Sequence, residues 1–375
     1  MAFTGRELRS TLSEDGTLRL SLEQVSYDDP APDEVIVRVE AAPINPSDLG
    51  LLLGPAQIDS LREEGTAEAP AVVFDVPKGR LGSMKARLGQ SMPVGNEGAG
   101  TVVAAGAEVA HLMGKRVAAA AGAMFAEYRK LKARDVVALP EGVSAADGAA
   151  IFVNPMTALG FVETMRREGH SAIVHTAAAS NLGQMLQKIC LADGIPLVNI
   201  VRSDEQAAIL KDIGATHVVN SRDEDFRAKL TDAVADTGAT IAFDAIGGGA
   251  LGSDILQAME AAAVREMAEY SRYGSDRFKQ LYIYGALDLT PTTLNRLAFG
   301  FQWSVSGWLL LPFFRKAGVE TLTAMRQRVL AELTTTFASR YTRTIGLAEA
   351  LQPDVLRAYE RKATGEKFLI DPGLG

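Results

Sequence analysis

The chain has 375 residues, of which 47% are hydrophobic and 22% charged, with a formal net charge of −8. This composition is typical of a soluble globular α/β protein rather than a disordered chain. The length suggests two domains. The acidic balance argues against nucleic acid or an anionic membrane as a partner.

The first part of the chain, up to about residue 150, is predicted to be mostly β-structure. The sequence VIVRV at residues 35–39 alternates like a strand, and short apolar runs follow at residues 98–103 and 114–118, with glycines between them. Residues 55–93 are rich in charge, glycine and proline. This segment is either a lid over a cleft or a surface excursion, and we favour the excursion.

From about Asn154, helical patterns of ten to fifteen residues alternate with apolar strands, which predicts parallel βαβ units and a doubly wound sheet. The predicted strands begin near Ala172, Pro196, Thr240 and Leu281. A helix-like insertion at residues 259–280 carries Tyr270 and Tyr273, which we expect to be packing or interface residues. Helical patterns at 319–337 and 349–362 and a strand at 368–370 close the chain.

The chain has one cysteine, Cys190, so an intrachain disulfide framework and a Cys-rich zinc site are excluded. The first residues carry charges every few positions instead of the apolar core of a signal peptide. The most apolar run, Trp303 to Phe314, is short and contains Pro312. We therefore expect a cytoplasmic protein with no membrane segment.

The segment from Ser171 to Asn220 reads strand, turn, helix, strand, as in a dinucleotide-binding unit. Its turn, AASNLG, lies where a Rossmann fold has G-x-G-x-x-G, and only the third glycine is kept. Small residues at the other two positions still let the backbone approach a pyrophosphate at the start of the following helix. The predicted cofactor-binding residues of this turn are Ala178, Ser180, Asn181, Leu182 and Gly183.

Arg202 and Ser203 stand where an NAD-selective site usually has an acidic residue, about twenty positions beyond the turn. A guanidinium there would pair with a 2′-phosphate, which predicts NADPH as the cofactor. The alternative is a solvated surface arginine. Asp204 is expected to cap a helix that begins at Glu205.

Further motifs, taken in their order and spacing, resemble the zinc-independent medium-chain dehydrogenase/reductases, the group of quinone oxidoreductases and 2-enoyl thioester reductases. They are AAPINPSD (41–48), GNEGAGTV (95–102), GKRV (114–117), AEY (126–128), LPEGVS (139–144), VNPMTA (153–158) and GATHVVN (214–220). The resemblance implies a GroES-like β domain at residues 1–152, completed by residues 320–375, and a Rossmann domain at residues 153–319. It also implies a cleft between them and a homodimer.

The resemblance also implies further cofactor-binding residues. Thr157 matches a family position near the nicotinamide, and the backbone at Trp308 and Leu309 matches the segment that meets the carboxamide. For the Trp308 side chain, core packing is the alternative. Gly247 and Gly285 are expected to border the same cleft, where Asp244 could serve only to orient backbone groups.

Zinc members of the superfamily carry a cysteine in the loop that corresponds to Pro46 to Asp48 of this chain. They carry Gly-His-Glu where this chain has Gly95-Asn96-Glu97. The four histidines show no ligand spacing, so we expect no metal. Hydride transfer from NADPH to a small-molecule quinone or enone needs placement more than a nucleophile. Asn45 is the candidate catalytic residue, as a hydrogen-bond donor, unless it is only a turn residue.

Enoyl thioester reduction needs a proton donor as well, and the family's enoyl reductases use a tyrosine soon after the INPSD loop. That position falls near Ala56, and no tyrosine occurs between Tyr27 and Tyr128. We therefore predict an NADPH-dependent reductase of quinones or related α,β-unsaturated carbonyls. The alternatives are a 2-enoyl thioester reductase and an NADPH-binding sensor with little catalysis.

Overall fold

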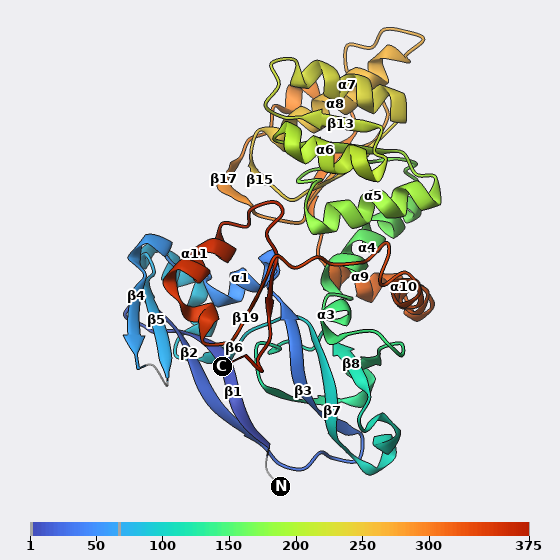
Figure 1. The fold of residues 1–375 in the computed structure, drawn as a ribbon. Helices are drawn as coiled ribbons and strands as arrows, with labels where there is room; N and C mark the ends of the chain where they lie inside the picture. Colours follow the sequence, from blue (N-terminus) through green and yellow to red (C-terminus); the bar gives the residue numbers. More distant parts are fainter. Residues whose placement is uncertain (1–2, 67–68, 375) are drawn as a thin grey trace. The chain divides into compact units, whose positions relative to one another are not determined.

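The computed structural model describes residues 3–66 and 69–374. The chain divides into two compact units, one formed by Met1–Val153 with Leu330–Gly375 and the other by Asn154–Val329 (Figure 1).

The first unit contains two sheets, and all but one of its strand pairs are antiparallel. The five-stranded sheet has the order β4-β5-β2-β1-β6 and the larger one the order β10-β8-β7-β3-β20-β19, with β9 also paired to β3. The smaller sheet consists of β1 (Phe3–Leu12), β2 (Thr17–Tyr27), β4 (Arg62–Gly65), β5 (Pro70–Asp75) and β6 (Ser91–Pro93). The larger sheet consists of β3 (Glu34–Pro43), β7 (Gly98–Ala105), β8 (Arg116–Ala119), β9 (Tyr128–Lys132), β10 (Val136–Ala138), β19 (Arg343–Ile345) and β20 (Phe368–Ile370).

The segment at residues 55–93 is built into the smaller sheet. Its strand β5 lies between β4 and β2, and Val72 and Phe74 of β5 are buried in the core. Residues 67 and 68 of this segment lie outside the described residues. Strand β4 next to it carries Arg62, Glu63 and Glu64, all exposed, so the charges of the segment obscured the buried strand.

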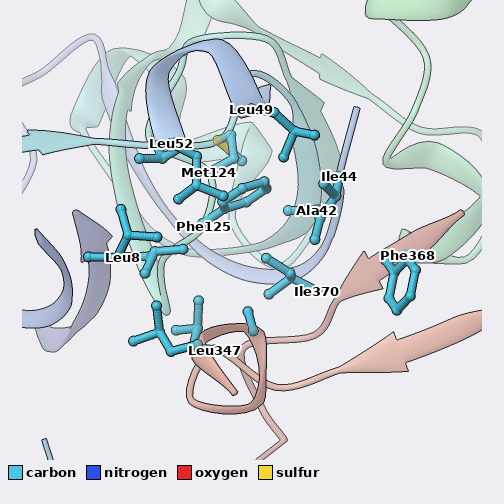
Figure 2. Close-up of a cluster of buried hydrophobic side chains, with 14 of the residues drawn as sticks. Leu8, Ala42, Ile44, Leu49, Leu52, Met124, Phe125, Leu347, Phe368 and Ile370 are labelled. Carbon is cyan, nitrogen blue, oxygen red and sulfur yellow. The ribbon is translucent and has the colours of Figure 1, made fainter. Parts of the chain in front are cut away.

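Helix α1 (Pro46–Leu52) lies on the core of the first unit. Figure 2 shows Leu49 and Leu52 of this helix pointing toward Met124 and Phe125, and all four side chains are buried. The apolar spacing of three residues puts Leu49 and Leu52 on one helix face, which fixes the helix and the residue before it, Asn45. The unit's other helices are α2 (Lys78–Leu81), α3 (Ala145–Gly148) and α11 (Pro353–Glu360).

The second unit contains a six-stranded parallel sheet in the order β13-β12-β11-β14-β16-β18. This is the 3-2-1-4-5-6 order of a Rossmann fold, with the topological switch point between β11 and β14. Every residue of β12 and β14 is buried, as the continuous apolar runs predict for strands covered on both faces. The predicted α/β class with a doubly wound sheet is confirmed.

The strands of this sheet are β11 (Ile173–His175), β12 (Leu197–Val201), β13 (His217–Asn220), β14 (Ile241–Asp244), β16 (Lys279–Ile283) and β18 (Trp303–Gly307). The helices are α4 (Val153–Arg167), α5 (Asn181–Asp193), α6 (Asp204–Ile213), α7 (Phe226–Thr237), α8 (Leu251–Arg265), α9 (Leu310–Ala317) and α10 (Val319–Ala331). A two-stranded sheet joins β15 (Gly247–Gly249) to β17 (Asp288–Thr292).

The predicted helical insertion at residues 259–280 is wrong beyond Arg265, where α8 ends. Tyr270 and Tyr273 are 93% and 61% exposed, so their prediction as packing residues of this chain is also wrong. Glu260 explains the break, because its carboxylate binds Ser275 N (2.7 Å) and Lys279 Nζ (2.6 Å) at the start of β16. The chain must turn back to make these buried contacts and cannot continue the helix.

The stretch Ala145–Arg167 is long and apolar enough to span a membrane by length and composition alone. Within the described residues, 83% of its most apolar window is buried inside the protein, as in the core helix of a globular fold.

Candidate functional site

The turn after β11 brings the five predicted cofactor-binding residues of AASNLG together. Ser180 is the N-cap of α5, and its Oγ accepts a hydrogen bond from Gly183 N (3.1 Å). A Cβ on Gly183 would lie 2.1 Å from Ala178 O, so only glycine fits this third position. The preceding residue, Ala177, has a left-handed backbone with φ +50°, which makes the turn tight without a glycine.

This turn fits an anionic ligand. Helix α5 begins at Asn181, and the first backbone N–H groups of a helix have no acceptor within the helix itself. Ala178 and Ala179 are buried and carry only a methyl group, the smallest side chain after glycine. Backbone N–H groups and the positive end of α5 therefore face the place where a pyrophosphate would lie.

The residues after β12 offer a free cation. Arg202 is exposed, and among the described residues no ion pair of its guanidinium is found. Ser203 is the N-cap of α6, with its Oγ accepting from Gln206 N (3.3 Å), so this hydroxyl already serves the helix. The prediction that Asp204 caps the helix is wrong, because the extended residue is Ser203. Asp204 is the first helical residue and accepts a bond from Asn220 Nδ2 (3.1 Å).

The loops after β14 and β16 pack backbone against backbone. A Cβ on Gly285 would lie 2.5 Å from Ala245 O, and one on Gly247 would lie 2.8 Å from Gly285 O. Asp244 holds the first loop by accepting from Thr176 Oγ1 (2.7 Å) and Gly247 N (3.1 Å). Asp244 thus orients backbone groups, and both glycines allow the two loops to approach each other closely.

The side chain of Trp308 packs in the core of the second unit. It is 7% exposed, its ring meets Phe161 edge-on at 4.8 Å, and its Nε1 donates to Thr164 Oγ1 (3.0 Å). Leu309, in contrast, is 65% exposed. Thr157 is buried on α4, one turn before Phe161.

Asn45 lies in the first unit as the N-cap of α1 and is buried. Its backbone N donates to Asp48 Oδ2 (2.8 Å), and its Nδ2 donates to Glu97 Oε1 (2.9 Å). The second oxygen of Glu97 accepts from the backbone N–H groups of Phe152 and Val153 (both 2.9 Å). Asn45 is therefore a fixed amide within a polar network rather than a simple turn residue.

The two segments that the resemblance compares with zinc-ligand loops do lie side by side. Asn96 donates through its backbone N to Asp48 Oδ1 (2.7 Å) and through Nδ2 to Ser47 Oγ (2.9 Å). Among residues 3–66 and 69–374, no group of three His, Cys, Asp or Glu side chains is arranged to hold a metal. Asp48 supplies the one carboxylate of this contact, and its other polar groups are an amide and a hydroxyl, which are weak ligands for zinc.

Burial dominates the electrostatics around Asn45. It raises the pKa of Asp48 to about 7, against the two backbone hydrogen bonds that stabilise the carboxylate. Burial also raises the pKa of Glu97 and lowers that of Lys367 to about 8. The attraction between the two opposite charges works against both shifts. Sequence reasoning missed this cluster, and the available signal was the charged Glu97 within the small, apolar run GNEGAGTV.

Comparison with known proteins agrees with both halves of the fold. Residues 31–141 match the family model described as "Alcohol dehydrogenase GroES-like domain", and residues 181–265 match the one described as "Zinc-binding dehydrogenase". Together the two matches cover just over half of the chain.

Among curated proteins, the chain is 31% identical to the mitochondrial enoyl-[acyl-carrier-protein] reductase of Xenopus tropicalis over 208 residues, 53% of this chain and 51% of that one. It is 26% identical to the quinone oxidoreductase of Pseudomonas aeruginosa over 58% of this chain and 60% of that one. The chain thus spans about half to three-fifths of the length of these curated relatives.

Solved structures match along nearly the whole chain. A protein from Mesorhizobium loti, whose assignment as an NADPH:quinone reductase is provisional, is 28% identical with a TM-score of 0.72 and 98% of both chains covered. Escherichia coli quinone oxidoreductase in complex with NADPH is 19% identical, has a TM-score of 0.68, and covers 99% of this chain and 100% of its own, a likeness of fold alone. With both domain models matched in order on a GroES-like unit and a Rossmann unit, the chain belongs to the medium-chain dehydrogenase/reductase family.

Proposed function

We propose that the protein is an NADPH-dependent reductase that transfers hydride to a quinone or a related α,β-unsaturated carbonyl without zinc. The observation that carries this proposal is Arg202, an exposed guanidinium at the carboxyl end of β12 with no ion pair among the described residues. The turn at residues 178–183 follows β11, which pairs with β12, so it lies at the same edge of the sheet. The NADPH complex of the Escherichia coli quinone oxidoreductase supports the same cofactor.

Different residues of the second unit would bind different parts of the cofactor. The turn at residues 178–183 would hold the pyrophosphate, Arg202 with Ser203 the 2′-phosphate, and Gly247, Gly285, Thr157 and the backbone at Trp308 and Leu309 the nicotinamide side. When bound, NADPH supplies the hydride. Asn45 would orient the substrate through the Nδ2 proton that Glu97 does not occupy, and solvent can protonate the oxygens of a reduced quinone.

Arg202→Ala tests the cofactor preference. We expect NADPH to bind about 10- to 100-fold more weakly and NADH to be unaffected, because only the 2′-phosphate loses a charge-assisted hydrogen bond. Lys211→Ala is the matched control, since it removes an equal charge from the opposite end of α6. Calorimetric titration of each variant with both nucleotides measures the effect. Equal loss for NADPH and NADH, or loss for neither, would refute the assignment of Arg202.

A 2-enoyl thioester reductase is the second candidate, and the relative from Xenopus tropicalis favours it. Against it, the segment between Tyr27 and Tyr128 contains no tyrosine to deliver a proton near Asn45. Steady-state NADPH oxidation with matched quinones, enones and enoyl thioesters separates these substrates. Tight NADPH binding without turnover on any of them would favour the third candidate, a sensor.

We also propose that the protein is cytoplasmic and forms a homodimer.

A further inference from the structure

Arg87 is a buried cation for which the described part of the chain supplies no anion. The residue is 8% exposed, and no carboxylate among the described residues forms an ion pair with it. Burial lowers its pKa, and no neighbouring charge opposes that shift. The buried Lys279, in contrast, lies 2.6 Å from a carboxylate oxygen of Glu260. A buried charge without an opposite charge is costly, so Arg87 is suited to bind an anion from outside the chain.

The hydrogen bonds of Arg87 use only one of the three nitrogen atoms of its guanidinium. Its Nη2 donates to Ser10 Oγ (2.6 Å) and to the backbone oxygen of Leu51 (2.8 Å), in the last turn of α1. Both acceptors are neutral groups, so they fix the side chain and leave its charge uncompensated. Nε is buried without a partner, and Nη1 has no hydrogen bond to any described residue. Nη1 is not enclosed in the way Nε is, so it is the donor that remains for a ligand.

The turn after α1 leaves room beside this donor. Gly54 has a left-handed backbone with φ +50°, and a Cβ on it would lie 2.9 Å from Arg87 Nη1. Any side chain at this position would therefore crowd Nη1. A second guanidinium lies at the same turn, because Nη1 of the exposed Arg80 is 3.5 Å from the backbone oxygen of Pro55. Arg80 also forms no ion pair with a described residue, so two uncompensated guanidiniums flank Gly54 and Pro55.

The charge of the surrounding segment selects the ligand. Residues 76–96 contain Lys78, Arg80, Lys85 and Arg87 but no Asp or Glu, although the whole chain has a net charge of −8. Like charges held near one another repel, and an anion between them relieves the repulsion. A phosphate group carries nearly two negative charges and three acceptor oxygens, and its geometry matches a guanidinium fork. A carboxylate carries one charge and would leave one guanidinium uncompensated.

We propose that Arg87 and Arg80, at the turn formed by Gly54 and Pro55, bind the phosphate group of a small molecule. Arg87 holds the phosphate through Nη1, and Arg80 holds it from the exposed side. Ser10 fixes the guanidinium of Arg87 and is a positioning residue. The site belongs to the first unit and shares no residue with the proposed NADPH site, so it goes beyond the proposed function.

The test is calorimetric titration with inorganic phosphate and with phenyl phosphate in a phosphate-free buffer. We expect Arg87→Met to weaken the binding of inorganic phosphate about 10- to 100-fold, and Arg80→Met, which removes an exposed partner, about 2- to 5-fold. Lys78→Met is the matched control, since it removes an equal charge from the same segment and should leave binding unchanged. Tighter binding of phenyl phosphate supports a phosphate ester as the ligand, and equal binding of the two probes supports free phosphate.

Arg87→Met also loses the bonds to Ser10 and Leu51, which can weaken folding, whereas Arg80→Met leaves both bonds in place. Arg202→Ala should bind phosphate as the unmodified protein does. No binding of either probe at millimolar concentration overturns the inference, and so does unchanged binding in both arginine variants. Equal weakening by Lys78→Met would assign the binding to diffuse positive charge and overturn the site. Loss confined to Arg202→Ala would place the phosphate in the proposed cofactor site, which also overturns the inference.

Discussion

Asp48 makes the stability of the first unit depend on pH. Its carboxylate is fully buried between the backbone N–H groups of Asn45 and Asn96 and close to Glu97 and Lys367. The native pKa of about 7 lies above the ordinary value of 3.8. The native state therefore binds a proton below pH 7, whereas the unfolded state binds one only near pH 4.

We expect the free energy of unfolding to fall as pH rises from about 5 to 7, by up to ~1.4 kcal/mol per pH unit. Lys367 acts in the opposite direction and only above pH 8, where the native lysine, with a pKa of about 8, loses its proton first. Urea unfolding at pH 5, 6, 7 and 8 measures the slope. Asp48→Asn should reduce it, and an unchanged slope in that variant would assign the dependence to another group.

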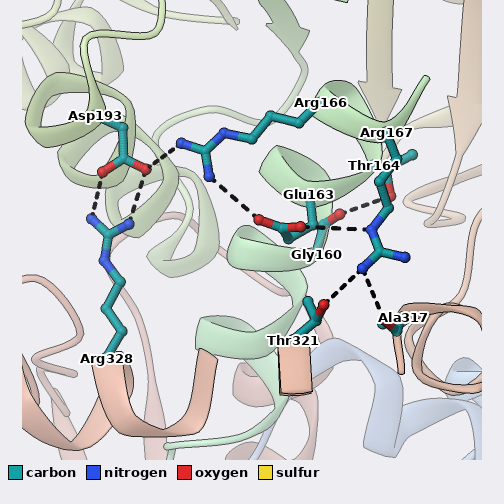
Figure 3. Close-up of polar contacts among 9 residues, drawn as sticks. All are labelled: Gly160, Glu163, Thr164, Arg166, Arg167, Asp193, Ala317, Thr321 and Arg328. Carbon is teal, nitrogen blue, oxygen red and sulfur yellow. Dashed lines mark hydrogen bonds and ion pairs between the residues drawn. The ribbon is translucent and has the colours of Figure 1, made fainter. Parts of the chain in front are cut away.

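Helix α9 is held at its C-terminal end by one arginine of α4. Arg167 donates to the carbonyl oxygens of Lys316 (3.2 Å) and Ala317 (2.8 Å) and to Thr321 Oγ1 (2.7 Å) at the start of α10. Figure 3 shows this guanidinium beside Glu163, whereas Arg166 reaches toward both Glu163 and Asp193. A cation at the negative end of α9 is favourable and also satisfies carbonyls that the helix leaves open.

Arg167→Met should therefore destabilise the second unit by about 1 kcal/mol and increase hydrogen exchange in residues 310–321, because the open carbonyls lose their donors. Arg166→Met is the matched control on the same helix. Arg166 makes exposed ion pairs with Glu163 and Asp193, which are worth at most about 1 kcal/mol and do not touch α9. Equal exchange in the two variants would rule out a specific role of Arg167 in holding α9.

Elements whose signal is local could be predicted from the sequence, and contacts between distant segments could not. The strand predicted near Ala172 begins at Ile173, and the AASNLG turn is one continuous structure, because apolar runs and turn residues are neighbours in the chain. The end of α8 depends on Glu260 meeting Lys279, and the fixed amide of Asn45 depends on Glu97, 52 residues away. The burial of Asp48, which raises its pKa, also depends on contacts between distant segments and could not be predicted from the sequence alone.

At the scale of the whole molecule, the parallel sheet ends in an open edge. Strand β18 pairs with β16 on one side, and no strand among the described residues pairs with its other side. Lys279 N donates to Gln302 O (3.1 Å) and Trp308 N donates to Ile283 O (2.9 Å), so even-numbered residues of this strand bond to β16. The backbone N–H groups of Trp303, Val305 and Gly307 therefore point to the open edge.

An open edge of this kind is a template for pairing with a second copy, and we expect the protein to be a homodimer through β18. Val305→Pro removes one outward N–H and leaves the bonds to β16 in place, as proline does on an edge strand. Val305→Thr keeps the N–H and is the matched control. Light scattering after gel filtration at micromolar concentration should give a monomer for Val305→Pro and a dimer for Val305→Thr. A monomeric unmodified protein would refute the dimer, whereas a dimer that survives Val305→Pro would place its interface elsewhere.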